Sequence, residues 1–265
     1  IIQSGNVASK ALAEHIGGSE PAFADIMTAE AKRLGMKNTN FMNATGLPDP
    51  AHITTARDMA ILAQAIIRDN PKYYPIYSEK EFTYNNIKQG NRNALLYTDP
   101  SVDGLKTGHT EAAGYCLVAS SKRGNMRLIT AVMGTNSMQE RADQTRALFS
   151  WGFSSYETIK PLTAGKVLGD AQVWFGTENH VKAGLDRDLS ITLPRGQKDK
   201  VQAVTRLMPD LEAPIAKGQK VGEVVVTLDG KTISTQPVVA MEAVEETNFV
   251  VCLWHHLKRF LSNLF

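Results

Sequence analysis

The sequence has few cysteines, no long apolar run and almost no net charge, and each shortage excludes a class of protein. Its two cysteines, Cys116 and Cys252, lie far apart without metal-ligand spacing. A disulfide framework is therefore excluded, and both are expected to act as small apolar side chains. No run of about 20 apolar residues occurs, so no membrane-spanning helix is expected. A formal net charge of +2 gives no reason to expect nucleic acid as a partner.

The length and the first residue limit the organisation of the chain. A chain of 265 residues that is 43% hydrophobic can form one large globular domain or two smaller ones. It begins at Ile1 with neither an initiator methionine nor a signal peptide, which predicts a processed or truncated chain.

The first part of the chain has the spacing of helices. Helical patterns cover residues 7–18, 21–35 and 54–70, the second with a proline in its first turn and a glycine after its end. Residues 38–53 are rich in turn residues, and a loop of that length inside a domain is more often functional than accidental. Residues 76–98 read as short strands broken by Asn and Gly.

A hairpin and a helix are predicted next. The strand candidates 115–120 and 127–133 flank a Lys-Arg-Gly-Asn turn, which predicts an antiparallel pair. Ser137 and Glu140 form a capping box that opens a helix running to about Trp151. Helices around an antiparallel sheet predict an α+β or mixed α/β domain.

The composition changes near Thr158. From there the pattern is strand-like, and the strongest hairpin signal of the sequence is Asp229-Gly230. We therefore expect a first domain over residues 1–157 and a small all-β sandwich over residues 158–247. The strands expected in the second domain are 172–175, 189–193, 202–207, 222–228 and 231–234.

The last segment, residues 248–265, has an amphipathic pattern. On a helical wheel its leucines, Phe249 and Phe260 share one side, and His255, Lys258 and Arg259 lie on the other, with Phe265 at the edge of the apolar arc. This pattern is typical of a helix lying in a membrane interface. The alternative is a C-terminal helix that packs on its own domain.

Two short motifs carry the chemistry. Lys106-Thr107-Gly108 places a cation, a hydroxyl and a residue without a side chain in a row. The first two can bind a carboxylate, while the backbone amides beside the glycine face a substrate carbonyl. Lys-Thr-Gly alone is a moderate signal at best, and its alternative is a charged turn between strands. The second motif, Ser4-Gly5-Asn6, is common by chance.

Together with His109-Thr110, the small second domain and the amphipathic tail, the two motifs resemble one family. The sequence is similar to low-molecular-mass penicillin-binding proteins that act as D-alanyl-D-alanine carboxypeptidases, the DacA, DacC and DacD group. The resemblance extends over essentially the whole chain. It implies a penicillin-binding transpeptidase/β-lactamase-like first domain.

The sequence departs from this family in one respect. The family nucleophile is the serine of a Ser-x-x-Lys motif upstream of Ser-Gly-Asn, and no serine here has lysine three residues later. The i, i+3 spacing is needed to bring both side chains to one helix face. We therefore expect an incomplete first domain and a chain without acyl-enzyme chemistry.

The resemblance implies a role for each remaining motif residue. Ser4 would relay a proton toward the leaving amine, with Lys106 beside it as a fixed positive charge. Asn6 would bind the substrate amide. Thr107 and Lys106 would bind the terminal carboxylate, and the backbone N–H of His109 would be half of the oxyanion hole.

Two arginines and one ring are open to more than one interpretation. Arg92 and Arg141 are further candidates for binding the carboxylate, and each could equally form an ordinary surface ion pair. The His109 ring could simply pack beside its strand. The remaining histidines show no partner pattern, so no metal is expected, and the family needs no cofactor.

The resemblance also implies partners and a location. The substrate would be a peptidoglycan stem peptide ending in D-Ala-D-Ala, and β-lactams would bind at the same site. Residues 248–265 would attach the chain to the periplasmic side of the bacterial inner membrane as a peripheral protein. Two alternatives remain: a β-lactamase, with Glu81 or Asp103 as the nearest carboxylates, and a non-catalytic membrane-bound scaffolding or binding fragment.

Overall fold

The computed structural model describes residues 1–248, which form two compact units. The first unit is Ile1–Ser155 and the second begins at Tyr156, two residues before the boundary expected at 158. The amphipathic helix expected over 248–265 lies outside the described residues, apart from Asn248. Each unit is described by itself.

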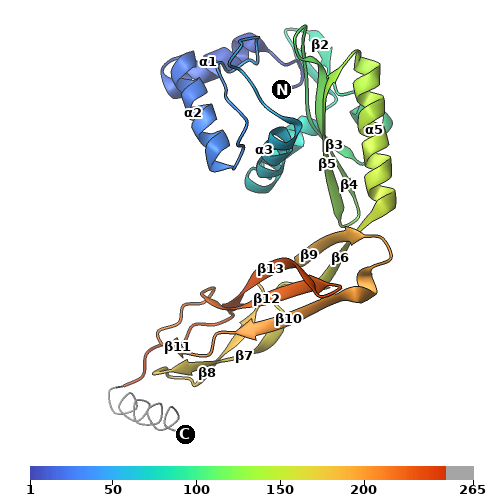
Figure 1. The fold of residues 1–265 in the computed structure, drawn as a ribbon. Coiled ribbons are helices and arrows are strands. Elements are labelled where there is room, and N and C mark those ends of the chain that lie inside the picture. The colour runs from blue at the N-terminus through green and yellow to red at the C-terminus, as the bar shows by residue number, and fades with distance from the viewer. Residues whose placement is uncertain (249–265) are drawn as a thin grey trace. The chain divides into compact units, whose positions relative to one another are not determined.

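A three-stranded antiparallel sheet is the centre of the first unit. Its strand order is β3 (Val102–Thr110), β4 (Gly114–Arg123) and β5 (Met126–Thr135). Helix α5 (Met138–Ser155) packs on one face of the sheet and α3 (Ala56–Asp69) packs on the other (Figure 1). The expected hairpin is confirmed. One bond of the expected capping box is present, since Ser137 Oγ accepts the Glu140 N–H at 3.0 Å, while Glu140 Oε2 accepts the Asn136 N–H at 2.8 Å. Helix α5 continues four residues beyond its expected end.

The helices before the sheet follow their predicted limits closely. Helix α1 (Asn6–Gly17) lies against α2 (Glu20–Arg33), where Ser19 caps the first turn. Gly35 follows α2 with φ of 87°, a backbone conformation that glycine adopts without the cost of a β-carbon. Thr55 caps α3 by accepting the Asp58 N–H at 3.1 Å.

The segment before β3 differs in part from the expectation. Residues Tyr74–Ser78 form the 3₁₀ turn η1, and β1 (Glu81–Tyr84) and β2 (Ile87–Gly90) pair as a small hairpin. The expectation of strands up to residue 98 was wrong, because Leu95–Thr98 form the short helix α4. Leu95 and Leu96 are both buried and turn into the core beside β3.

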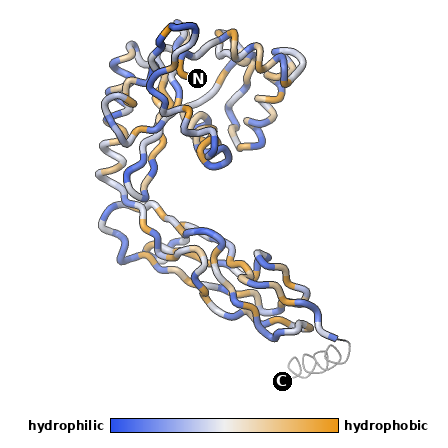
Figure 2. Tube along the Cα trace, turned by 180° about the vertical axis from the view of Figure 1, so that it is seen from behind, coloured by the Kyte–Doolittle hydropathy of each residue, from blue (hydrophilic) through white to orange (hydrophobic). Residues whose placement is uncertain are grey.

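The second unit consists almost entirely of β-strands in two sheets. The six-stranded sheet has the order β10 (Val201–Leu207), β12 (Lys220–Leu228), β13 (Lys231–Ala240), β8 (His180–Gly184), β7 (Val167–Trp174) and β11 (Leu211–Glu212). The second sheet pairs β6 (Tyr156–Leu162) with β9 (Leu189–Pro194). Apolar and polar residues alternate along these strands (Figure 2), and the apolar ones form one buried cluster.

The predicted Asp229-Gly230 turn joins β12 to β13. Both residues have positive φ, 49° and 76°, as the tightest hairpin turns require. The sequence pattern missed β6, β8 and β11. Strand β8 has only five residues, HVKAG, with the burial pattern of a half-exposed strand.

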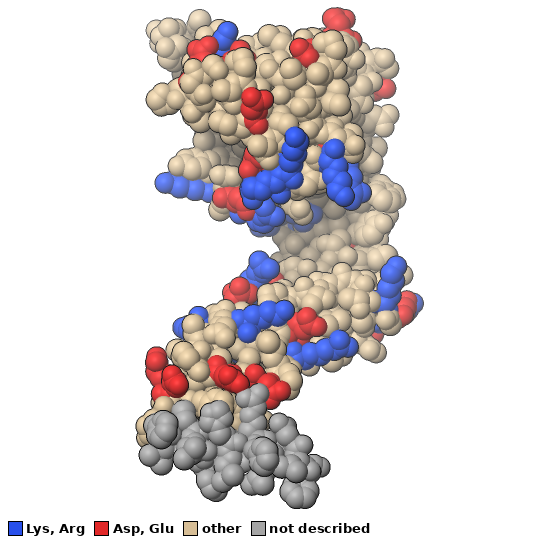
Figure 3. All heavy atoms as spheres, turned by 60° about the vertical axis from the view of Figure 1, so that its left-hand side comes forward, with Lys and Arg blue, Asp and Glu red and all other residues tan. Residues whose placement is uncertain are grey.

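Surface charge contributes little to the fold. On the face drawn in Figure 3, Lys and Arg gather at one edge of the first unit, and the two signs are mixed on the second. Exposed ion pairs such as Arg68–Asp69 and Lys160–Asp188 are screened by solvent, so they add little to stability. Within residues 1–248, no helix is long and apolar enough to cross a membrane.

Candidate active site

The candidate site is built on β3, which is the first strand of its sheet. β3 pairs with β4 along one edge, and no other described strand pairs with its second edge. Lys106, Thr107, Gly108 and His109 follow one another near the end of this strand. Their backbone amides and carbonyls therefore lie on or beside an edge that can accept an extended ligand.

Three positively charged side chains lie near one another at this position. Lys106 is half-buried and its Nζ donates to its neighbour's carbonyl, Thr107 O, at 2.7 Å. Burial first, and then the positive charges of Arg92 and Arg141, lower the pKa of Lys106 to about 8. In the described part of the chain, no carboxylate forms an ion pair with any of the three. The cluster therefore favours an anion from outside the protein.

Arg141 ties the strand to helix α5. It is 4% exposed and donates to the carbonyls of Gly108 at 3.3 Å, Cys116 at 3.4 Å and Arg92 at 3.3 Å. Cys116 lies at a bulge, where β5 has one residue more than β4. The alternative of a surface ion pair was wrong for Arg141. Its contacts are those of a group that holds the end of β3 in place.

Thr107 and Gly108 differ in the room around them. Thr107 is 9% exposed, and its hydroxyl makes no hydrogen bond with any residue from 1 to 248. At Gly108 an added β-carbon would meet only the Cys116 Cβ, at 3.9 Å, an ordinary contact distance. The protein's own packing therefore does not require glycine at 108, in contrast to Gly104, where the Tyr74 hydroxyl would lie 2.7 Å away. A ligand lying against β3 would explain why residue 108 is a glycine.

The His109 ring stacks on Tyr115, its partner across the β3–β4 ladder. The ring centroids are 3.9 Å apart at an interplanar angle of 31°. The Arg141 guanidinium lies 5.7 Å from the Tyr115 centroid. The imidazole thus packs beside the strand, which leaves the backbone amide of His109 as the group with a chemical role to assign.

Ser4 and Asn6 stand at the start of α1, in a segment that contacts Arg92. The Arg92 guanidinium donates to Gln3 Oε1 at 3.2 Å, and the same arginine acts on Lys106 through its charge. Ser4 has a φ of 59°, an uncommon backbone conformation for a residue other than glycine. Asn6 is the first residue of α1 and is exposed. Arg92 is therefore the link between the two motifs.

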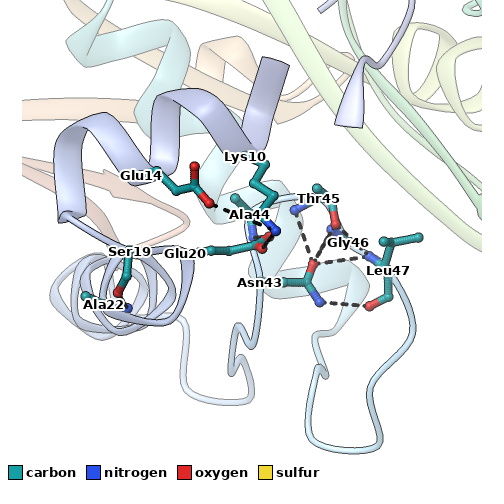
Figure 4. A network of polar contacts seen from close by, with 10 residues as sticks. All are labelled: Lys10, Glu14, Ser19, Glu20, Ala22, Asn43, Ala44, Thr45, Gly46 and Leu47. Carbon is teal, nitrogen blue, oxygen red and sulfur yellow. Dashed lines mark hydrogen bonds and ion pairs between the residues drawn. The ribbon is translucent and has the colours of Figure 1, made fainter. Parts of the chain in front are cut away.

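The loop expected over residues 38–53 is held by side-chain hydrogen bonds (Figure 4). Asn43 Oδ1 accepts the backbone N–H groups of residues 45, 46 and 47 at 3.1, 2.7 and 3.2 Å. Glu20 accepts the Ala44 N–H at 3.3 Å and lies 3.6 Å from Lys10. These contacts join the loop to α1 and α2, and thereby support the helix that begins with Asn6.

Neither carboxylate considered for a β-lactamase is available to activate water. Asp103 accepts hydrogen bonds from Tyr74 Oη and Arg127 Nη1, both at 2.8 Å. Glu81 lies 2.7 Å from Lys88 on the exposed β1–β2 hairpin. The geometry therefore gives no support to the β-lactamase alternative.

Sequence reasoning missed three residues that shape the site. Gln3 accepts a hydrogen bond from Arg92, and the Tyr115 ring stacks on the His109 ring. Asn93, which is 1% exposed, donates to the Gly104 carbonyl at 3.1 Å. The position of Tyr115 across a predicted hairpin could have suggested its contact. Nothing in the sequence pattern pointed to Gln3 or Asn93.

Comparisons with known proteins agree with the two-unit architecture. Residues 1–137 match the family described as D-alanyl-D-alanine carboxypeptidase, and residues 156–246 match the C-terminal domain of penicillin-binding protein 5. The D-alanyl-D-alanine carboxypeptidase DacA of Haemophilus influenzae is 46% identical over 100% of this chain and 68% of its own length. The chain spans about two thirds of the length of the curated relatives it matches.

Solved structures give the same result. Penicillin-binding protein 5 from Haemophilus influenzae is 48% identical with a TM-score of 0.79, covering 93% of this chain and 72% of that one. Penicillin-binding protein D2 from Listeria monocytogenes in its cefotaxime-bound form is 31% identical with a TM-score of 0.54, covering 58% of this chain and 63% of that one. With a family match over more than half of its residues, the chain belongs to the D-alanyl-D-alanine carboxypeptidase family.

Proposed function

We propose that the β3 site binds the terminal carboxylate of peptidoglycan stem peptides ending in D-Ala-D-Ala, as part of a serine-type carboxypeptidase. The observation that carries this proposal is the cluster of Lys106, Arg92 and Arg141 without a carboxylate partner among residues 1–248. A single carboxylate placed there would neutralise part of the cluster. Thr107 has a free hydroxyl for the same carboxylate.

The remaining motif residues then take roles along the substrate. The open edge of β3 lets the peptide lie against Gly108, with its scissile carbonyl toward the N–H of His109. A donor of this kind contributes about 3–4 kcal/mol to lowering the barrier. Ser4 relays a proton to the leaving amine and Asn6 binds the substrate amide, while Arg141 keeps the strand end in place.

The acylation step needs a Ser-x-x-Lys pair, which these 265 residues do not contain. These residues therefore bind the substrate carboxylate but form no acyl-enzyme. This separates the proposal from that of a scaffolding fragment, which would bind neither the peptide nor a β-lactam at β3.

Binding can be tested on the chain as it is. We expect N-acetyl-D-alanyl-D-alanine to shift the amide resonances of β3 in an NMR titration, and its C-terminal amide, which lacks the carboxylate, to bind at least tenfold more weakly. Lys106→Gln should abolish the shifts. Lys122→Gln is the matched control, because Lys122 is an exposed lysine of β4. Equal binding of acid and amide would refute the carboxylate site.

Catalysis can be tested in a chimaera that adds the Ser-x-x-Lys segment of the Haemophilus influenzae relative. We expect release of D-alanine from a pentapeptide and a long-lived adduct with benzylpenicillin, both lost in Lys106→Gln. Fast turnover of benzylpenicillin would instead favour a β-lactamase. Failure of the chimaera with intact carboxylate binding by the chain would leave recognition standing and refute the catalytic part.

Membrane attachment on the periplasmic side of the inner membrane is a second part of the proposal, supported by the amphipathic pattern of residues 248–265. The chain should sediment with vesicles containing anionic lipid, and a version ending at residue 248 should stay in the supernatant. If the shortened version still sediments, attachment lies elsewhere in the chain.

A further inference from the structure

A groove of about 280 Å³ lies in the second unit, which no part of the proposed function uses. Five consecutive residues of β9, Ser190–Pro194, form one wall, and the opposite wall is formed by Leu228, Ile233 and Ser234. Five residues of a strand extend over about 17 Å. The groove therefore follows the strand along its length, so its shape suits an extended ligand.

Two of the strands that line the groove, β9 and β13, lack a neighbour along part or all of one edge, whereas β12, which contributes Leu228, is paired on both edges. β9 pairs with β6 and with no other described strand. β13 pairs with β8 only at Val239 and Ala240, so no strand among residues 1–248 pairs with the outer edge of residues 231–236. Gln236 of β13 donates to the Arg187 carbonyl, just before β9, at 3.0 Å. Two open strand edges thus border one groove.

The register shows which backbone groups of β9 are directed away from β6. Pro194, which has no N–H, pairs opposite Tyr156, and the Thr158 and Thr192 hydroxyls lie 2.8 Å apart. Both features are typical of the non-hydrogen-bonded pairs of an antiparallel ladder. Because the pattern alternates, the N–H and C=O groups of Thr192 are directed away from β6, toward the open edge. The extra residue of the register shift opposite Ser190 lies on β6, so the alternation along β9 continues to Ser190.

The lining of the groove indicates the chemistry of its ligand. None of its eight residues is charged, and it combines hydroxyls with apolar side chains. Ile233 is the extra residue of a bulge on β13 and is 40% exposed. We propose that this groove binds a neutral, extended peptide as an added β-strand along β9. Backbone hydrogen bonds would supply the affinity and the apolar wall at Ile233 the side-chain preference.

The proposal can be tested on the full chain with phage-displayed random heptapeptides. We expect enrichment of uncharged sequences with alternating apolar residues. A fluorescent synthetic copy of an enriched peptide should bind at least tenfold more weakly to Ser190→Pro, which removes an outward N–H. The matched control Ser190→Ala keeps that N–H and should bind within twofold of the unchanged chain. Hydrogen exchange at residues 190 and 192 should slow when peptide is bound.

A second variant guards against misfolding of the proline variant. Ile233→Glu places a charge at an exposed position of the groove and should also reduce binding at least tenfold, with an unchanged melting temperature. The proposal is overturned if no peptide is enriched, or if enriched peptides bind both variants normally. It is likewise overturned if peptide-free glycan strands of peptidoglycan displace the bound peptide from the groove, which would mark it as a sugar site.

Discussion

The two units differ in how their apolar side chains are buried. In the second unit sixteen buried residues from both sheets form one cluster. In the first unit the buried residues of the sheet and of the helices and turn packed on it form separate clusters of seven and four, one on each side of β3 and β4. Helix α1 buries only Ala13 and exposes Val7, Leu12 and Ile16. The second unit therefore has the core of an independent domain. In the first unit, the buried residues mainly hold one strand edge in place.

The largest effect is expected from truncating the single core. Leu193 is 1% exposed within the cluster of the second unit, so Leu193→Ala should reduce the free energy of unfolding of that unit by about 2–5 kcal/mol. Calorimetry combined with hydrogen exchange should show the loss in the second unit alone. Leu117→Ala, at an equally buried position of β4, is the counterpart for the first unit. A shift of both units by either variant would contradict their independence.

The next largest effect compares two glycines of β3. Gly104→Ala would place a β-carbon 2.7 Å from the Tyr74 hydroxyl and should destabilise the first unit by about 1–3 kcal/mol. Gly108→Ala meets only an ordinary contact, so it should leave the melting temperature unchanged while it weakens binding of N-acetyl-D-alanyl-D-alanine. In a Tyr74→Phe background the cost of Gly104→Ala should fall, which a double-mutant cycle measures. Equal melting temperatures for Gly104→Ala and the unchanged chain would refute this.

A smaller effect follows from the pKa of Lys106, which is about 8 in the folded chain and near 10.5 when exposed. Between these values the unfolded chain holds the proton that the folded chain has lost, so the free energy of unfolding rises with pH. The slope is at most about 1.4 kcal/mol per pH unit and is reduced by solvent screening. Lys106→Met should remove this rise, measured by urea unfolding between pH 8 and 9.5. An identical slope in the variant would contradict the assignment.

Carboxylate binding should follow the opposite trend with pH. A bound anion favours the charged amine, so affinity should decrease as the pH rises through about 8. The NMR titration of N-acetyl-D-alanyl-D-alanine at pH 7 and pH 9 measures this directly. Unchanged affinity would mean that the carboxylate does not contact Lys106.

The elements that sequence predicted well are those set by local chemistry. The Asp229-Gly230 turn, the Ser137 and Glu140 capping box and the glycine after α2 each depend on a few adjacent residues. The strand expected where α4 lies was wrong because Leu95 and Leu96 are buried by contacts with β3 that no local pattern reveals. The same limit explains the missed strand β8, whose partner on one side, β13, lies more than 50 residues away.

The residues of the candidate site also differ in whether a local sequence pattern reveals them. The motif residues Lys106, Thr107 and Gly108 could be read from the sequence because they are adjacent on one strand. Other parts of the site depend on contacts between distant segments. Gln3, next to Ser4, accepts a hydrogen bond from Arg92, and Arg141 is buried and donates to three backbone carbonyls. The sequence therefore proposed which groups contact a ligand, and the structure added the groups that hold them in place.

The smallest effect is expected from an exposed apolar residue of α1, the helix on which the contrast between the units is clearest. Leu12 is 62% exposed, so Leu12→Gln, which keeps a good helix former, should change the free energy of unfolding by no more than about 0.5 kcal/mol. Ala13→Leu, at a fully buried position between α1 and α2, should cost about 1–3 kcal/mol through overpacking. Chemical denaturation measures both. A loss of several kcal/mol in Leu12→Gln would mean that the exposed face of α1 is covered in solution, and the first unit would then bury more apolar surface than its own residues provide.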